Sequence, residues 1–235
     1  MAFTAATVLR RANTILQDQG AIRWTPMELR DWLNEAMRTI VTMKPNARSG
    51  TVTLTLVAGT RQDLPDEYTI LSQVIANVET NGALGRAIRT VVNRTLLDAQ
   101  IPGWHNATLL PNSATTQLVL QDPMAPREFY VVPGATAGSR VAAIVGKQSV
   151  DVPLPNAPGS SVLDIDSYIA PVQMDDWYQS ILLDLVLFRA FAKDSASPDA
   201  AGRSQTHLTL ATNQLVALGT AQDAATLAAA FRAAA

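Results

Sequence analysis

The amino-terminal residues place apolar side chains with the period of an α-helix. Between residues 4 and 19 apolar residues recur every three or four positions and form one stripe, and Gly20 is expected to end this helix. Thr25, Pro26 and Glu28 then form a capping box at the start of a second helix. Its apolar face continues until Lys44-Pro45, where proline stops the helix. The segment therefore predicts two helices, each with one side to bury.

After Gly50 the period changes from that of a helix to that of a β-strand. Residues 51–57 alternate threonine with aliphatic side chains, which is typical of a half-buried strand, and a turn is expected at residues 58–60. Further apolar or β-branched runs, separated by glycine, proline and asparagine, predict an antiparallel sheet or small barrel. They span residues 69–78, 87–92, 117–121, 128–132 and 140–145. Residues 94–100 are expected to form one or two helical turns, and the proline-rich residues 151–161 a loop.

Helical spacing returns near the carboxyl end of the chain. Residues 174–193 predict a helix whose positive N-terminus suits Asp175 and Asp176. Ser197-Pro198 predicts the start of another helix, which Gly219 is expected to close. Residues 220–235 are almost all helix formers, but an isolated helix of this length is marginal in water. This tail is therefore expected to order only when it docks on a partner.

Two helices at each end of the chain, with strands between them, predict an α+β fold. Residues 1–48 and 163–219 are predicted to form the two halves of a helical bundle. Residues 49–162 are predicted to form an inserted antiparallel β module, and residues 220–235 a docking tail. The divisions follow the changes of period.

Charge is scarce in this chain, and cysteine is absent. Charged residues make up 16% of the sequence, whereas about 25% is usual in soluble domains. This shortage favours a surface covered by other subunits, although an uncharged polar surface would also satisfy it. The lack of cysteine excludes disulfides and thiolate metal sites. A net charge of −2 with scattered basic residues argues against tight binding of nucleic acid.

No segment predicts a membrane span or a secretion signal. The first residues lack the apolar stretch of a signal peptide, and no window reaches the roughly 18 apolar residues that a span needs. We therefore expect a soluble protein that is synthesised in the cytoplasm.

The candidates for catalytic chemistry are few. His105 and His207 lie in different segments and have no partner at a metal-binding spacing. Asp164, Asp166 and Asp175 could hold a divalent cation in a metal-dependent hydrolase, but they lack a calcium-loop pattern. Charges at a helix N-terminus and in a solvated turn explain these carboxylates more simply. Phosphate-loop, dinucleotide and nucleophile-elbow motifs are also absent, so no cofactor, metal site or catalytic residue is predicted.

The helix predicted at residues 174–193 carries two charges inside an apolar stretch, at Asp184 and Arg189. Burying either charge without a partner would cost several kcal/mol. They either cross to another helix or subunit, or both emerge on a narrow solvent face. Three tryptophans are expected to anchor the core, namely Trp24, Trp32 and Trp177.

Several segments together resemble the head-to-tail adaptor proteins of short-tailed bacteriophages, the group that includes tail tubular protein A. The resemblance is carried by Leu16–Asp18, Ile22–Leu29, Asn34–Ile40, Lys44-Pro45, Ala58–Pro65 and Phe188–Asp194. Its signature positions are Arg23, Trp24, Thr25, Glu28 and Trp32.

The resemblance implies a structural virion protein at the head–tail junction. It implies a ring of twelve copies beneath the portal protein, which would extend the DNA channel and form a platform for the tail nozzle protein. DNA would pass through the lumen without specific binding. Another tail-completion or capsid-stabilising role would fit the same composition and differ in stoichiometry.

Docking of the tail would then join this ring to the portal. Leu227 and Phe231 lie one helical turn apart in the sequence and are the expected anchors, with Arg232 reaching an acidic partner. Ordering of the tail and binding would be a single event.

Overall fold

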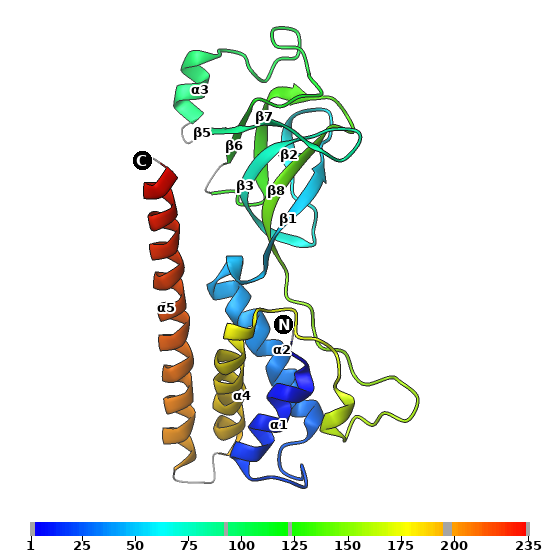
Figure 1. The fold of residues 1–235 in the computed structure, drawn as a ribbon, viewed down its shortest axis with the longest axis vertical. Helices are drawn as coiled ribbons and strands as arrows, with labels where there is room; N and C mark the ends of the chain where they lie inside the picture. The colour runs from blue at the N-terminus through cyan, green and yellow to red at the C-terminus, as the bar shows by residue number, and fades with distance from the viewer. Residues whose placement is uncertain (1–2, 92–93, 122–123, 195–198, 234–235) are drawn as a thin grey trace. The chain divides into compact units, whose positions relative to one another are not determined.

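A computed structural model describes residues 3–91, 94–121, 124–194 and 199–233, with side chains up to residue 221. The chain divides into two compact units (Figure 1). The first comprises residues 1–40 and 149–235 and is helical, whereas the second comprises residues 41–148 and is rich in strands. The α+β class predicted from the sequence is confirmed. Both boundaries between the units lie earlier in the chain than the predicted divisions at 48/49 and 162/163.

Helices α1 (Ala5–Leu16) and α2 (Pro26–Met43) begin the first unit. The capping box predicted for α2 is present, because the N–H of Glu28 donates to Oγ1 of Thr25 and the N–H of Thr25 donates to Oε2 of Glu28. The sequence suggested that Gly20 would end α1, but this prediction is wrong. The helix stops at Leu16, where Gln17 takes the left-handed conformation with φ of 55°.

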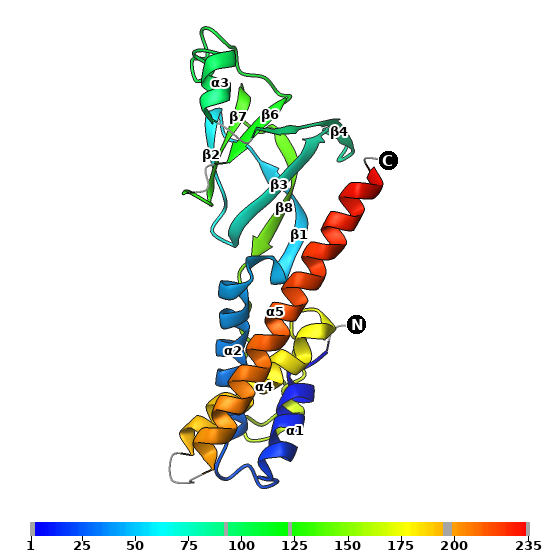
Figure 2. The same cartoon turned by 90° about the vertical axis from the view of Figure 1, so that its left-hand side faces the viewer.

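Two helices from the other end of the chain complete this unit, α4 (Gln179–Lys193) and α5 (Ala200–Ala233). Short 3-10 turns precede α4 at Ile165–Ser167 and Asp176–Tyr178. Helix α4 packs between α1 and α5, and α5 runs alongside it (Figure 2). Eight residues of α4 are buried, so both sides of this helix face protein. The predicted start of the last helix, Ser197-Pro198, lies outside the described residues.

Gly219 does not close the last helix, which continues from Ala200 to Ala233. The backbone of Gly219 is not in the left-handed conformation that ends a helix at glycine. Alanine, leucine and glutamine flank it, and their helix propensity outweighs the roughly 1 kcal/mol that one glycine costs. Whether residues 220–235 act as a separate docking tail remains a prediction.

The second unit contains two four-stranded sheets. One has the order β1-β8-β3-β4 and the other β2-β7-β6-β5. Their strands are β1 (Ser49–Thr55), β2 (Gly59–Asp63), β3 (Tyr68–Val78), β4 (Leu84–Ala87), β5 (Arg89–Val91), β6 (Leu118–Gln121), β7 (Glu128–Ala135) and β8 (Arg140–Lys147). A 3-10 turn at Pro45–Arg48 leads into β1, and helix α3 (Arg94–Gln100) follows β5.

The strand predicted from alternating threonines is confirmed, since Leu54 and Leu56 are buried while Thr51, Thr53 and Thr55 are exposed. Strand β2 was missed, because its polar sequence had suggested only a turn. The sheets are also not purely antiparallel. Strands β5 and β6 pair in parallel, because helix α3 and its loop return the chain to the same end of the sheet.

Replacing Gly219 with alanine tests its position inside α5. Nothing lies within 4 Å of the Cβ that alanine would add. Gly219→Ala should therefore raise helical content in circular dichroism and increase the free energy of unfolding by up to about 1 kcal/mol. Gly202→Ala, in the same helix with equally open space, is the matched control and should behave alike. A loss of helix at Gly219→Ala alone would show that the helix ends there.

Candidate interaction surfaces

The connection between α1 and α2 is held by one carboxylate. Asp18 accepts hydrogen bonds from the backbone N–H groups of Ile22, Arg23 and Trp24, at 3.1, 2.8 and 2.9 Å. These bonds, led by that from Trp24, lower the pKa of Asp18, which keeps the carboxylate charged. Ala21 has a φ of 48°, which lets the chain curl around the acceptor. Asp18 therefore holds the turn that joins α1 to α2.

The signature residues fix this connection to the far end of α4. Trp24 is buried, and its indole Nε1–H donates to the carbonyl of Ala190 at 3.0 Å. Arg23 forms an ion pair with Asp194 and lies over the ring of Trp24. The residues that carry the resemblance therefore join the two halves of the bundle.

Glu28 has a second contact beyond its capping role. Nζ of Lys193 lies 2.6 Å from Oε1 of Glu28 and also donates to the carbonyl of Arg23. The hydrogen bond from Lys193 is the main reason that the pKa of Glu28 is lowered. The sequence offered no sign of this pair, because 165 positions separate the two residues.

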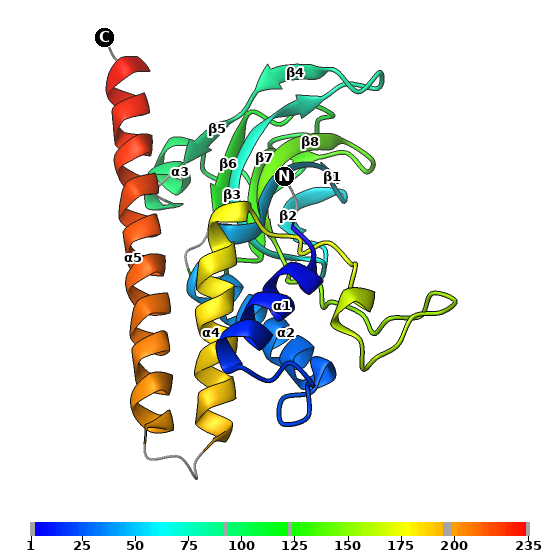
Figure 3. The same cartoon turned by 60° about the horizontal axis from the view of Figure 1, so that its bottom comes forward.

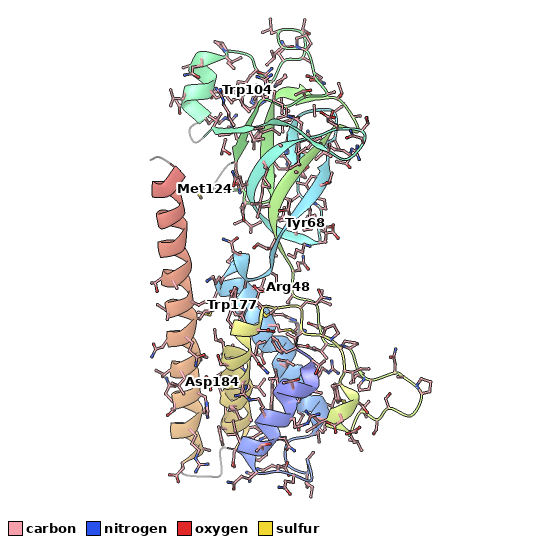
Figure 4. The ribbon with its side chains drawn as sticks, in the orientation of Figure 1. Arg48, Tyr68, Trp104, Met124, Trp177 and Asp184 are labelled. Atoms are coloured by element: carbon pink, nitrogen blue, oxygen red, sulfur yellow. The ribbon has the colours of Figure 1, made fainter. Side chains whose placement is uncertain are left out.

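The prediction of three tryptophan anchors is confirmed for Trp24 and wrong for Trp177. Trp177 is 57% exposed, because the 3-10 turn before α4 directs Tyr178 into the core instead (Figure 4). Trp32 is half-buried. The fully buried tryptophan is Trp104 in the second unit, whose Nε1–H donates to Asp98 at 2.7 Å.

Asp184 and Arg189 both cross to other helices of the same chain. Arg189 pairs with Glu35 of α2 on the surface. Asp184 lies at the junction of α4 and α5, and its carboxylate contacts two side chains of α5 (Figure 4). Nδ1 of His207 lies 2.9 Å from one oxygen, and Nε2 of Gln214 donates to the other at 3.1 Å. The alternative of a solvent face is therefore wrong for Asp184.

Further contacts complete this polar junction. The hydroxyl of Ser180 donates to Gln214 at 2.8 Å, and the ring of His207 stacks on Phe191 with centroids 5.6 Å apart. Because these hydrogen bonds join particular residues of the two helices, the cluster fixes the register of α5 on α4. Sequence reasoning missed this role of His207, since a lone histidine without a spaced partner carries no signal.

The other histidine lies in the second unit and serves a loop. His105 packs on Trp104, and its Nδ1 lies 3.0 Å from the hydroxyl of Thr60. Burial lowers the pKa of His105. These contacts fit the loop role expected for it.

The acidic residues considered for metal binding are engaged in turns. Asp164 accepts the N–H of Asp166 at 3.0 Å and the hydroxyl of Ser167 at 2.9 Å, and Asp166 pairs with Arg10 of α1. Asp175 precedes the 3-10 turn at Asp176–Tyr178. Within residues 3–91, 94–121, 124–194 and 199–221, three or more histidine or acidic side chains nowhere gather closely enough to hold a metal ion. The contacts of Asp164 and Asp166 support the turn-capping interpretation.

The α5 outer face is an uncharged helical surface of the described first unit. It consists of exposed residues spaced three or four apart, namely Thr206, Thr209, Leu210, Asn213, Val216, Ala217 and Thr220. From Ser204 to Gln222, about five helical turns, the sequence has no acidic residue, lysine or arginine. A solvent-exposed helix normally carries charge on such a face. This surface therefore has the composition of a protein interface.

The three predicted tail anchors, Leu227, Phe231 and Arg232, belong to α5. Their side chains lie outside the described part of the structure, so their role stays a prediction. None of the helices in the described ranges is both long and apolar enough to cross a membrane.

Asp184 provides a test of the junction between α4 and α5. Asp184→Ala should lower the free energy of unfolding by about 2–3 kcal/mol, because His207 and Gln214 lose their shared acceptor in a largely buried place. Asp184→Asn keeps an acceptor of the same shape and should cost less. Urea denaturation measures both values.

Arg189→Ala is the matched control on the same helix. Its pair with Glu35 is exposed and should contribute less than about 1 kcal/mol. Equal losses for Asp184→Ala and Arg189→Ala would contradict the assignment of Asp184 as the residue that holds α5.

Comparison with known proteins identifies one family. The sequence model described as SU10 adaptor protein matches residues 3–233, which is nearly the whole chain. No curated protein matches the chain at a significant level.

Proposed function

Because this chain belongs to the SU10 adaptor protein family, and is thus a phage adaptor, we propose that it forms a twelve-copy ring beneath the portal. The resemblance predicted from the sequence is confirmed at the level of the family. The match over residues 3–233 carries the proposal, since it includes both units and the long last helix. The family is one of structural proteins of the virion.

In this role the chain works by assembly and performs no catalysis. The ring extends the DNA channel of the portal and gives the tail nozzle protein its platform. DNA passes through without being gripped, because binding its phosphates would need clustered cations. Several arginines of the described chain instead have carboxylate partners, among them Arg10, Arg23, Arg30, Arg38, Arg61, Arg127 and Arg189. The net charge of −2 agrees with this picture.

The end of α5 makes the contact with the portal. Among the α5 side chains that the structure describes, the buried ones all precede Gly219, and a chain that ends at Gly219 keeps every one of them. Leu227 and Phe231 supply apolar contact area and Arg232 meets an acidic group of the portal. Binding through one helical end leaves the rest of each copy free to pack in the ring.

Truncation of the chain after Gly219 tests this contact. The truncated chain should keep its fold and bind the portal of the same phage more weakly. Leu227→Ala combined with Phe231→Ala should weaken binding about a hundredfold, because losing the burial of two large side chains costs about 3 kcal/mol. Biolayer interferometry with immobilised portal measures both effects.

Thr226→Ala is the control, since it lies beside Leu227 and removes little apolar area. It should bind like the natural chain. Unchanged binding of the truncated chain would show that the portal contacts another part of the protein.

A further inference from the structure

The segment between the second unit and α4 forms a long loop on the bundle. We call residues 153–163 the arm; they contain no helix or strand (Figure 1). Loops of this length without secondary structure are uncommon in compact domains and are usually functional. We propose that the arm of one copy packs on the α5 outer face of the next copy. This inference rests on the proposed ring.

The arm leaves the bundle from a fixed point. Oδ1 of Asn34 accepts the N–H of Val152 at 2.8 Å, and Nδ2 of Asn34 donates to the carbonyl of Val152 at 3.3 Å. Both residues are buried. Asp151, just before them, pairs with Arg38 of α2. Helix α2 therefore holds the start of the arm by side-chain contacts.

The end of the arm is fixed as well. Tyr168 is buried, and its hydroxyl donates to the carbonyl of Val162 at 2.8 Å. The N–H of Ser161 donates to the hydroxyl of Ser167 at 3.1 Å. Within the arm, the N–H of Ser160 donates to the carbonyl of Ala157 and closes a turn. These contacts order the arm before any partner binds, which lowers the entropy that binding costs.

The surface that this ordered arm presents to solvent is uncharged and mostly apolar, with Asn156 and Ser161 as its exposed polar residues. Leu154 and Leu163 are 42% and 69% exposed, and Val162 is also exposed. No charged residue occurs between Asp151 and Asp164. Three prolines restrict the backbone further. A loop that only connected two elements would not need exposed leucines on an ordered backbone.

The α5 outer face matches the arm in its lack of charge. Leu210 and Val216 are 44% and 61% exposed and lie among threonine, asparagine and alanine. Covering either surface with a charged partner would bury a charge without an opposite one, which is costly. When the arm covers the α5 outer face, apolar side chains are buried and no charge is left without a partner. The two surfaces are therefore electrostatically suited to each other.

Their positions exclude contact within one chain. The arm projects from the side of the first unit that is away from α5, and α4 and α1 lie between them (Figure 3). Two different surfaces on opposite sides of one protein can pair only between copies, in a head-to-tail contact. Such contacts repeat around a closed ring. A contact of α5 with itself would instead give a two-fold dimer.

Cross-linking tests the contact directly, because the chain has no cysteine. The variants are Leu163→Cys, Val216→Cys and the two combined, each bound to the portal of the same phage. A short bis-maleimide should convert the double variant into a ladder of covalent multimers. Each single variant should stay monomeric, since a head-to-tail contact brings different residues together. Arg11→Cys combined with Val216→Cys is the control pair and should give no ladder.

The other outcomes overturn the inference in distinct ways. Dimers from Val216→Cys alone would show that α5 packs on itself, and adducts with the portal would assign the α5 outer face to that partner. Portal complexes with many copies of the chain but no ladder would exclude the arm as the contact while leaving the proposed ring intact. If no chain joins the portal, the proposed function and this inference fall together.

Discussion

The burial of α4 is the interaction on which the helical unit depends. Its apolar residues face both α1 and α5, so neither end of the chain can cover the helix alone. Asp184 sits within this apolar surface and requires partners, which α5 supplies through His207 and Gln214. The need to pair one largely buried carboxylate therefore sets where α5 lies along α4. Trp24 and Glu28 attach the α1–α2 connection to the other end of the same helix.

This arrangement leaves surfaces that suit an assembly protein. Helix α5 uses one face to cover α4 and turns an uncharged face outward. The arm, on the other side of the bundle, is held by Asn34 and Tyr168 and exposes leucines. In the proposed ring, the chain would pack against copies of itself and against other virion proteins. In the described chain, long uncharged segments of the sequence therefore lie on α5 and on the arm.

Local patterns in the sequence predicted much of this fold. The capping box at Thr25 and Glu28, the alternating strand after Gly50 and the apolar spacing of α4 depend on neighbouring residues, and each is present. The failures involve tertiary structure. Gly219 continues a helix because its neighbours favour one, and Trp177 is exposed because the adjacent tyrosine occupies the core.

The contacts that define the candidate surfaces could not be predicted from local sequence patterns either. No spacing rule links Asn34 to Val152 or Trp24 to Ala190, because the residues of each pair are more than a hundred positions apart.

The most direct test of the account is electron microscopy of the chain mixed with the portal of the same phage. The account predicts an added ring of twelve copies beneath the portal. Portals that remain bare, or copies bound without ring symmetry, would contradict it.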